Sequence, residues 1–127
     1  MILIITHAPT ASSLVSALRD ILPDELTKNI ITIDVHIHDQ KDAKIFEAQQ
    51  FITRQATDEV LIFTDIIGST PYHIARQVLV NMTNYSCVVV TGVNLPMLIK
   101  ATNYRALSLK AWVSQLMACA LDWVQAE

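Results

Sequence analysis

The chain has 127 residues, of which 52% are hydrophobic, and its nine basic and twelve acidic side chains give a formal net charge of −3. This length can bury a core, and we expect residues 1–127 to form one domain. The absence of a basic cluster argues against nucleic-acid binding, and no apolar run is long enough to span a membrane. The opening MILIITHAP has no basic segment, so we expect a first strand rather than a signal peptide, and a cytoplasmic protein.

Apolar runs typical of strands alternate along the chain with runs of helical periodicity. Strands are expected over Ile2–Ile5, Ile30–Ile37, Glu59–Thr64 and Ser86–Thr91. Helices are expected over Ala11–Leu22, Asp42–Gln55, Pro71–Met82, Met97–Ala101 and Ala111–Gln125. The strand over Ile30–Ile37 alternates apolar and polar residues, which indicates an edge of the sheet.

This alternation predicts an α/β fold of three layers, with helices on both faces of a parallel four-stranded sheet. We expect the flavodoxin-like strand order 2-1-3-4. In that order the first and third strands are neighbours at the topological switch point, where ligands bind beyond the carboxyl ends of the strands. The first strand leads to His7 and the third to Asp65, so these two residues should lie close together.

The segment Thr64–Tyr72, TDIIGSTPY, joins the third strand to the third helix and is rich in polar residues. It contains an acid, a glycine and two hydroxyls: Asp65, Gly68, Ser69 and Thr70. Thr70 is expected at the N-cap of the helix and Pro71 at its first position. Because a helix N-terminus presents free N–H groups, we expect this segment to bind an anion.

His7 supplies a nucleophile beside that anion site. A neutral imidazole is nucleophilic near neutral pH, and its tautomer depends on the group that accepts its other N–H. Asp65 suits this orienting role, as the acid does in Ser-His-Asp triads, while Thr70 and Ser69 would hold a phosphoryl group. The pattern therefore predicts phosphoryl transfer through His7. A structural histidine and an aspartate that only caps a turn are the alternative interpretation.

Other candidate sites are less specific. Asp34, His36 and His38 could place three metal ligands on one strand face, but the solvated face of an edge strand has the same pattern. Cys87 and Cys119 lie in apolar contexts and are expected to be buried free thiols. The two glycines of the chain do not have the spacing of a P-loop or a dinucleotide-binding motif.

Three segments carry a family resemblance: THA at Thr6–Ala8, TDIIGSTPYHIA at Thr64–Ala75 and TGVNLPML at Thr91–Leu98. With them, the chain resembles the enzyme IIA domain of the mannose family of the bacterial phosphoenolpyruvate-dependent sugar phosphotransferase system. The resemblance covers nearly the whole chain in length and element order. The last two segments are specific at this spacing and with the early histidine.

The resemblance implies a phosphohistidine carrier. Such domains accept a phosphoryl group from the phosphocarrier protein HPr on the histidine matching His7, and pass it to an enzyme IIB that phosphorylates sugar during uptake. The residue matching Asp65 hydrogen-bonds this histidine, and the one matching Thr70 lies at the phosphate. The segment with Gly92 and Asn94 lines the same crevice. Family members are typically homodimers, need no metal or organic cofactor, and meet the membrane only through a partner complex.

The chain departs from the family pattern at Ala8 and Ser69, where glycines are usual, and at His73, where asparagine is common. Alanine still has a backbone N–H, so Ala8 is expected to contribute to phosphate binding together with Gly68. His73 is expected to be neutral and peripheral, because a positive charge is unfavourable at a helix N-terminus. We expect no attached IIB segment, and a IIB partner, if there is one, that is a separate protein.

Three alternatives stay open. The first is a regulatory module, phosphorylated on the same histidine but read by a regulator or kinase without sugar transport. The second is the related phosphocarrier subunit for dihydroxyacetone phosphorylation, against which the GVNLPML segment argues. The third is an α/β domain that is not phosphorylated. The sequence does not identify the sugar, because sugar specificity would lie in the membrane partners.

Overall fold

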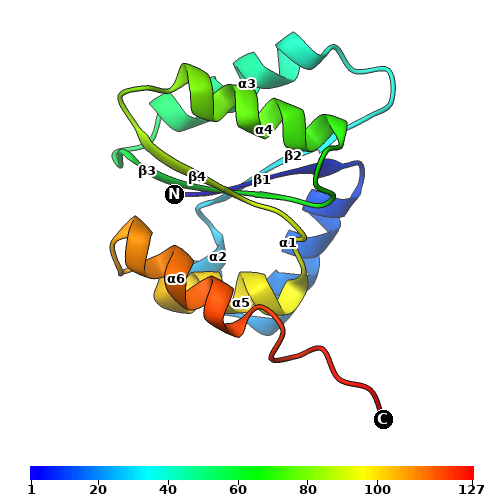
Figure 1. Cartoon of the computed structure of the whole chain (residues 1–127), viewed down its shortest axis with the longest axis vertical. Helices are drawn as coiled ribbons and strands as arrows, with labels where there is room; N and C mark the ends of the chain where they lie inside the picture. Colours follow the sequence, from blue (N-terminus) through cyan, green and yellow to red (C-terminus); the bar gives the residue numbers. More distant parts are fainter.

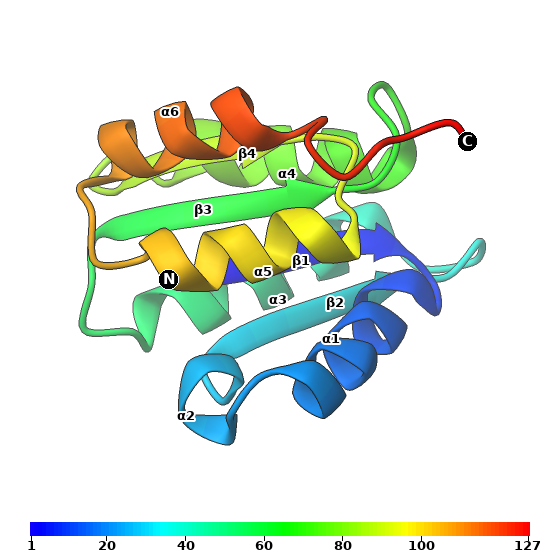
Figure 2. The same cartoon turned by 90° about the horizontal axis from the view of Figure 1, so that it is seen from below.

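Four parallel strands form the centre of a computed structural model that describes residues 1–127 (Figure 1). They are β1 (Ile2–His7), β2 (Ile30–Val35), β3 (Glu59–Thr64) and β4 (Ser86–Val90). Their order is β2-β1-β3-β4, which confirms the predicted order and places β2 at an edge. The carboxyl ends of the strands therefore meet at one side of the sheet (Figure 2).

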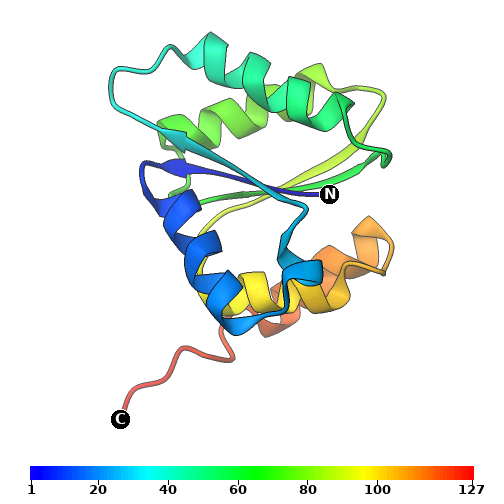
Figure 3. The same ribbon diagram turned by 180° about the vertical axis from the view of Figure 1, so that it is seen from behind.

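Helices cover both faces of this sheet. They are α1 (Thr10–Ile21), α2 (Asp24–Thr27), α3 (Lys41–Thr53), α4 (Thr70–Asn81), α5 (Leu95–Tyr104) and α6 (Leu109–Cys119). One face is covered by α3 and α4, and the other by α1, α2, α5 and α6, as Figures 1 and 3 show. No helix combines the length and the apolar character that crossing a bilayer requires.

The strands separate two apolar layers. On β1, Ile2 and Ile4 belong to the layer formed with α1, α5 and α6, whereas Leu3 and Ile5 belong to the layer formed with α3 and α4. Both faces of the strand are thus buried, which explains why its sequence is continuously apolar. Trp112 links two helices of the first layer, because its buried indole N–H donates to the carbonyl oxygen of Ala101 at 2.9 Å.

The second half of the chain differs most from the predicted helix boundaries. Helix α5 starts at Leu95 and is longer than predicted, because the Asn94 side chain caps it by accepting the N–H of Met97 at 2.9 Å. Helix α6 starts at Leu109 and ends at Cys119, although helical periodicity continues to Gln125. The apolar residues beyond it, Leu121, Trp123 and Val124, are exposed, so no core contact stabilises a further turn.

Smaller differences have similar causes. The four-residue helix α2 was not predicted, because such a short helix has no periodicity to detect. On α3, helical periodicity places Ile45, Phe46 and Ile52 on one side, but only Ile45 and Ile52 are buried, and Phe46 is 64% exposed. Both cysteines are free thiols, and both are half-buried rather than fully buried.

Candidate functional site

The end of β1 and the end of β3 bring His7 and Asp65 into direct contact. The imidazole Nδ1 of His7 lies 2.7 Å from Oδ2 of Asp65, and the backbone N–H of His7 donates to the same oxygen at 2.8 Å. The other carboxylate oxygen, Oδ1, accepts the backbone N–H of Ile66 at 2.8 Å. These contacts fix the carboxylate, and the carboxylate fixes the orientation of the imidazole.

The surroundings of Asp65 keep it ionised. Its side chain is only 15% exposed, compared with 49% for His7. Burial raises the pKa of Asp65, but hydrogen bonds from the backbone N–H and ring of His7 and from the N–H of Ile66 lower it, and the net pKa is below its ordinary value. Because an ionised carboxylate can only accept, the neutral ring of His7 has its proton on Nδ1 and its free lone pair on Nε2.

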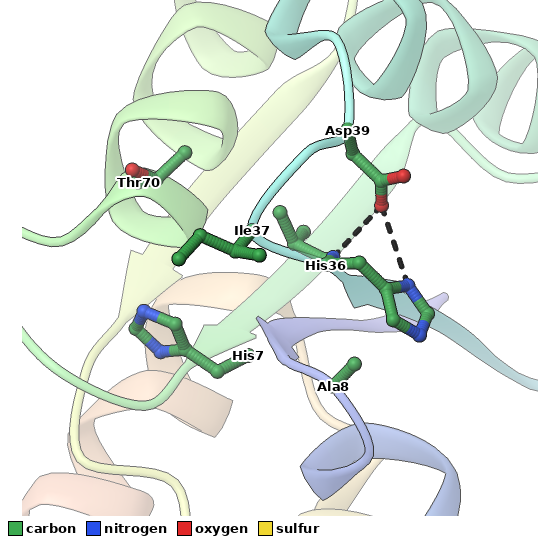
Figure 4. Close-up of a pocket in the computed structure, with 7 residues that line it drawn as sticks. His7, Ala8, His36, Ile37, Asp39 and Thr70 are labelled. Atoms are coloured by element: carbon green, nitrogen blue, oxygen red, sulfur yellow. Dashed lines mark hydrogen bonds and ion pairs between the residues drawn. The ribbon is translucent and has the colours of Figure 1, made fainter.

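A cavity of about 470 Å³ opens beside the ring of His7 (Figure 4). Its lining comes from the ends of β1 and β2, the loop after β2 and the start of α4, and comprises His7, Ala8, Val35, His36, Ile37, Asp39 and Thr70. The arrangement therefore combines a nucleophilic nitrogen with a space that another molecule can enter.

A family model described as "PTS system fructose IIA component" matches residues 1–117. The chain belongs to this family. Its members are IIA components of the phosphotransferase system and act as phosphoryl carriers, so the resemblance seen in the sequence is confirmed.

Solved structures share the fold at low sequence identity. The phosphotransferase component EIIA from Streptococcus agalactiae aligns with a TM-score of 0.88 at 20% identity, over 98% of this chain and 95% of that one. The mannose/sorbose-specific IIA subunit from Enterococcus faecalis aligns with a TM-score of 0.85 at 17% identity, over 99% of this chain and 92% of that one. A sigma-54 interaction domain protein from Enterococcus faecalis aligns with a TM-score of 0.77 at 13% identity, over 98% of this chain and 96% of that one. At these identities the likeness shows the fold alone.

In this IIA component, Ser69 and not Thr70 occupies the N-cap position of α4, so the predicted cap was one residue off. The Ser69 hydroxyl donates to the carbonyl oxygen of Ile66 at 2.7 Å and closes a turn instead of capping the helix. Gly68 allows this turn through its positive φ of 81°, a backbone conformation that glycine adopts without strain. Thr70 is the first helical residue, and its exposed side chain lines the cavity.

Gly92 and Asn94 were expected to line the same crevice as His7, but neither lines this cavity. The N–H of Gly92 donates to the carbonyl oxygen of Asp65 at 2.7 Å. Asn94 caps α5, and its Nδ2 donates to the carbonyl oxygen of Gly92 at 3.3 Å. The side chain of Asn94 is therefore committed to local structure, which explains why it is not part of the cavity wall.

Ala8 lines the cavity, but its backbone N–H donates to the carbonyl oxygen of Val35 at 3.0 Å. That donor is thus engaged within the fold, whereas the sequence predicts that Ala8 contributes to phosphate binding. The same hydrogen bond ties the end of β2 to the residue after His7, so the loop that follows β2 lines the cavity together with His7. The predicted strand order could have indicated that this loop lies near His7, because β2 also neighbours β1 and ends at the same edge of the sheet.

The alternative metal site is not assembled. Strand β2 ends at Val35, so Asp34, His36 and His38 do not share one strand face. Asp34 instead accepts the N–H of Ser12 at the start of α1, at 3.3 Å. No group of three or more histidine, cysteine or acidic side chains is arranged to hold a metal ion. His73 is exposed, packs edge-on against Tyr72 and does not line the cavity.

Proposed function

We propose that this protein carries phosphoryl groups to a sugar transporter, accepting them from HPr on His7 and passing them to an enzyme IIB partner. Membership of the IIA family supports the carrier role. The 2.7 Å contact between His7 Nδ1 and Asp65 Oδ2 carries the assignment to His7, because it leaves Nε2 as the nucleophile beside the cavity. We expect a cytoplasmic homodimer that reaches the membrane only through its partners.

The transfer is a displacement at phosphorus. The lone pair on Nε2 of His7 forms a new N–P bond while the N–P bond of phosphorylated HPr breaks, and the departing imidazole of HPr keeps the electron pair. The proton on Nδ1 stays in place, so the phosphorylated ring carries a positive charge that the Asp65 carboxylate stabilises. When the phosphoryl group passes to IIB, the N–P bond to His7 breaks, and Nε2 of His7 keeps the electron pair. Positioning and electrostatic stabilisation together supply most of the catalysis in such transfers.

The start of α4 supports binding of the phosphoryl group. Thr70 lines the cavity at the N-terminus of this 12-residue helix, where unpaired N–H groups and the helix dipole favour an anion. Pro71 has no N–H, and the hydroxyl of Ser69 is used within its own turn. Thr70 is therefore the proposed hydroxyl contact to the phosphate.

A regulatory module is the second candidate function. The sigma-54 interaction domain protein shares the fold, which makes this alternative relevant although the likeness extends to the fold only. Both functions require the same phosphorylation of His7. They differ in the fate of the phosphoryl group, since a transport component gives it to IIB, whereas the phosphorylated form of a regulatory module is read by another protein.

The test is to incubate the protein with phosphoenolpyruvate, enzyme I and HPr, and to detect an acid-labile phosphate by intact mass. Wild type and a His38→Ala control should gain one phosphate, and His7→Ala should gain none. Absence of phosphate on wild type, or its persistence on His7→Ala, would rule the carrier out. Adding candidate IIB proteins then separates the functions, because only a transport component loses its phosphate to one of them.

A further inference from the structure

The loop after β2 places a second histidine–aspartate pair on the wall of the same cavity. The backbone N–H of His36 donates to Oδ2 of Asp39 at 2.8 Å, and Nδ1 of His36 lies 3.4 Å from that oxygen (Figure 4). His7 engages Asp65 in the same way, with its N–H and Nδ1 facing one carboxylate oxygen. The contact of the His36 ring with Asp39 is longer than the 2.7 Å contact of His7 with Asp65, and the His36 side chain is 69% exposed.

His36 is also the one basic side chain on this wall of the cavity. No lysine or arginine lines the cavity, so His36 is the only lining side chain besides His7 that can become a cation. The pKa of Asp39 is lowered, mainly by the hydrogen bond from the backbone N–H of His36 and also by the charge of Lys44. Lys44 lies 3.7 Å from the same Asp39 oxygen and 3.1 Å from Glu47, and it does not line the cavity.

We propose that His36 is a binding contact for the incoming phosphoryl group, which it meets on the donor protein before the transfer to His7. The inference rests on the proposed function and deepens it. Figure 4 shows the rings of His7 and His36 on opposite sides of the cavity, with Ile37 between them. His36 thus contacts the phosphoryl group while the donor approaches, before the N–P bond to His7 forms, so it affects KM more than kcat. Exposed charges at an interface act mainly on encounter in this way.

The experiment measures phosphoryl transfer from phosphorylated HPr to this protein at rising HPr concentrations, at about pH 6.5, where imidazoles change charge. Four proteins are compared: wild type, His36→Gln, His36→Lys and His38→Gln. His38 is the matched control, because it lies in the same loop, is exposed and does not line the cavity.

We expect His36→Gln to raise KM roughly threefold to fivefold, the range for one exposed charge contact, with kcat nearly unchanged. His36→Lys should restore KM because it restores the charge, and His38→Gln should behave like wild type. The difference between His36→Gln and wild type should shrink at about 0.5 M salt, where screening removes exposed charge contacts.

The outcomes separate the two proposals. A wild type that accepts no phosphate overturns the carrier function and this inference with it. A wild type that accepts phosphate while His36→Gln keeps the same KM overturns the inference alone. A defect that His36→Lys does not rescue, or that persists at high salt, indicates a change in loop structure and also overturns it.

Discussion

A single oxygen of Asp65, Oδ2, receives both the backbone N–H and the imidazole Nδ1 of His7, at 2.8 and 2.7 Å. The two contacts tie the ring to the backbone at the end of β1, so the imidazole cannot rotate without losing its acceptor. The parallel register of β1 and β3, in which Ile5 pairs with Thr64, sets the distance between the two residues. The geometry of the site is therefore a consequence of sheet pairing.

Asp65→Asn should slow phosphoryl transfer to His7 by roughly 100-fold or more, because an amide neither fixes the tautomer nor stabilises a charged ring. Rapid-quench measurement of the phosphorylation rate checks this. Asp42→Asn, an exposed position at the start of α3, is the control and should transfer at the wild-type rate. A rate for Asp65→Asn equal to that of wild type would show that the carboxylate has no orienting role.

The same carboxylate predicts how stability depends on pH. The folded-state pKa of Asp65 lies below its ordinary value of 3.8, so ionised Asp65 stabilises the fold at pH values above 3.8. That contribution disappears as the pH falls through the lowered folded-state pKa. Wild type should therefore exceed Asp65→Asn in free energy of unfolding at pH 7, and the difference should shrink below about pH 4. Urea unfolding across this range measures it, and a difference that grows on acidification would contradict the assignment.

The strand order and the meeting of His7 with Asp65 could be predicted because both depend on long-range pattern. Alternating strands and helices determine which strands are neighbours, and the carboxyl ends of neighbouring parallel strands meet at one edge. No knowledge of individual side-chain contacts is needed for that step. The fold class and the centre of the site were accordingly accessible from the sequence.

The remaining details depend on local competition between hydrogen bonds. Ser69 and Thr70 are both plausible N-caps, and the structure uses the Ser69 hydroxyl to close a turn with Ile66. The end of α6 depends on whether Trp123 finds a core to pack against, which periodicity cannot reveal. The cavity wall around His36 arises from loop geometry after β2, where the sequence has no periodic signal.

Gly92→Ala should destabilise the protein by roughly 1 to 2 kcal/mol, because an alanine at a left-handed φ is strained. Gly92 has a φ of 76°, and a Cβ at this position would meet no atom within 4 Å, so the backbone angle alone sets the cost. Gly92→Asn should cost less, since asparagine tolerates this region. Urea denaturation compares the variants, and equal losses for alanine and asparagine would point to a different cause.

Trp112→Phe should lower the free energy of unfolding by about 1 to 3 kcal/mol. The substitution leaves the carbonyl of Ala101 without the indole donor at 2.9 Å and opens a gap between α5 and α6. Trp123→Phe is the matched control, because this tryptophan is 58% exposed, and it should change stability by less than about 0.5 kcal/mol. Chemical denaturation measures the free energy of unfolding of both variants. Equal losses for the two substitutions would contradict the prediction.

Thr70 and Ser69 should separate phosphate binding from folding, although they are adjacent hydroxyl residues. Thr70→Val keeps the shape of an exposed cavity residue but removes its hydroxyl, so transfer to His7 should slow roughly tenfold while stability stays near that of wild type. Ser69→Ala removes the 2.7 Å bond to the carbonyl of Ile66, so stability should fall by about 1 kcal/mol with a smaller effect on transfer.

The phosphorylation rate and the urea midpoint are measured for both variants. Each variant is the control for the other, because one should lose transfer and the other stability. A larger loss of transfer in Ser69→Ala than in Thr70→Val would reverse the assignment. The serine hydroxyl would then have to leave its turn in order to meet the phosphate. Such a change would be visible as loss of the Ile66 contact in the phosphorylated protein, because the Ser69 hydroxyl has only one proton to donate.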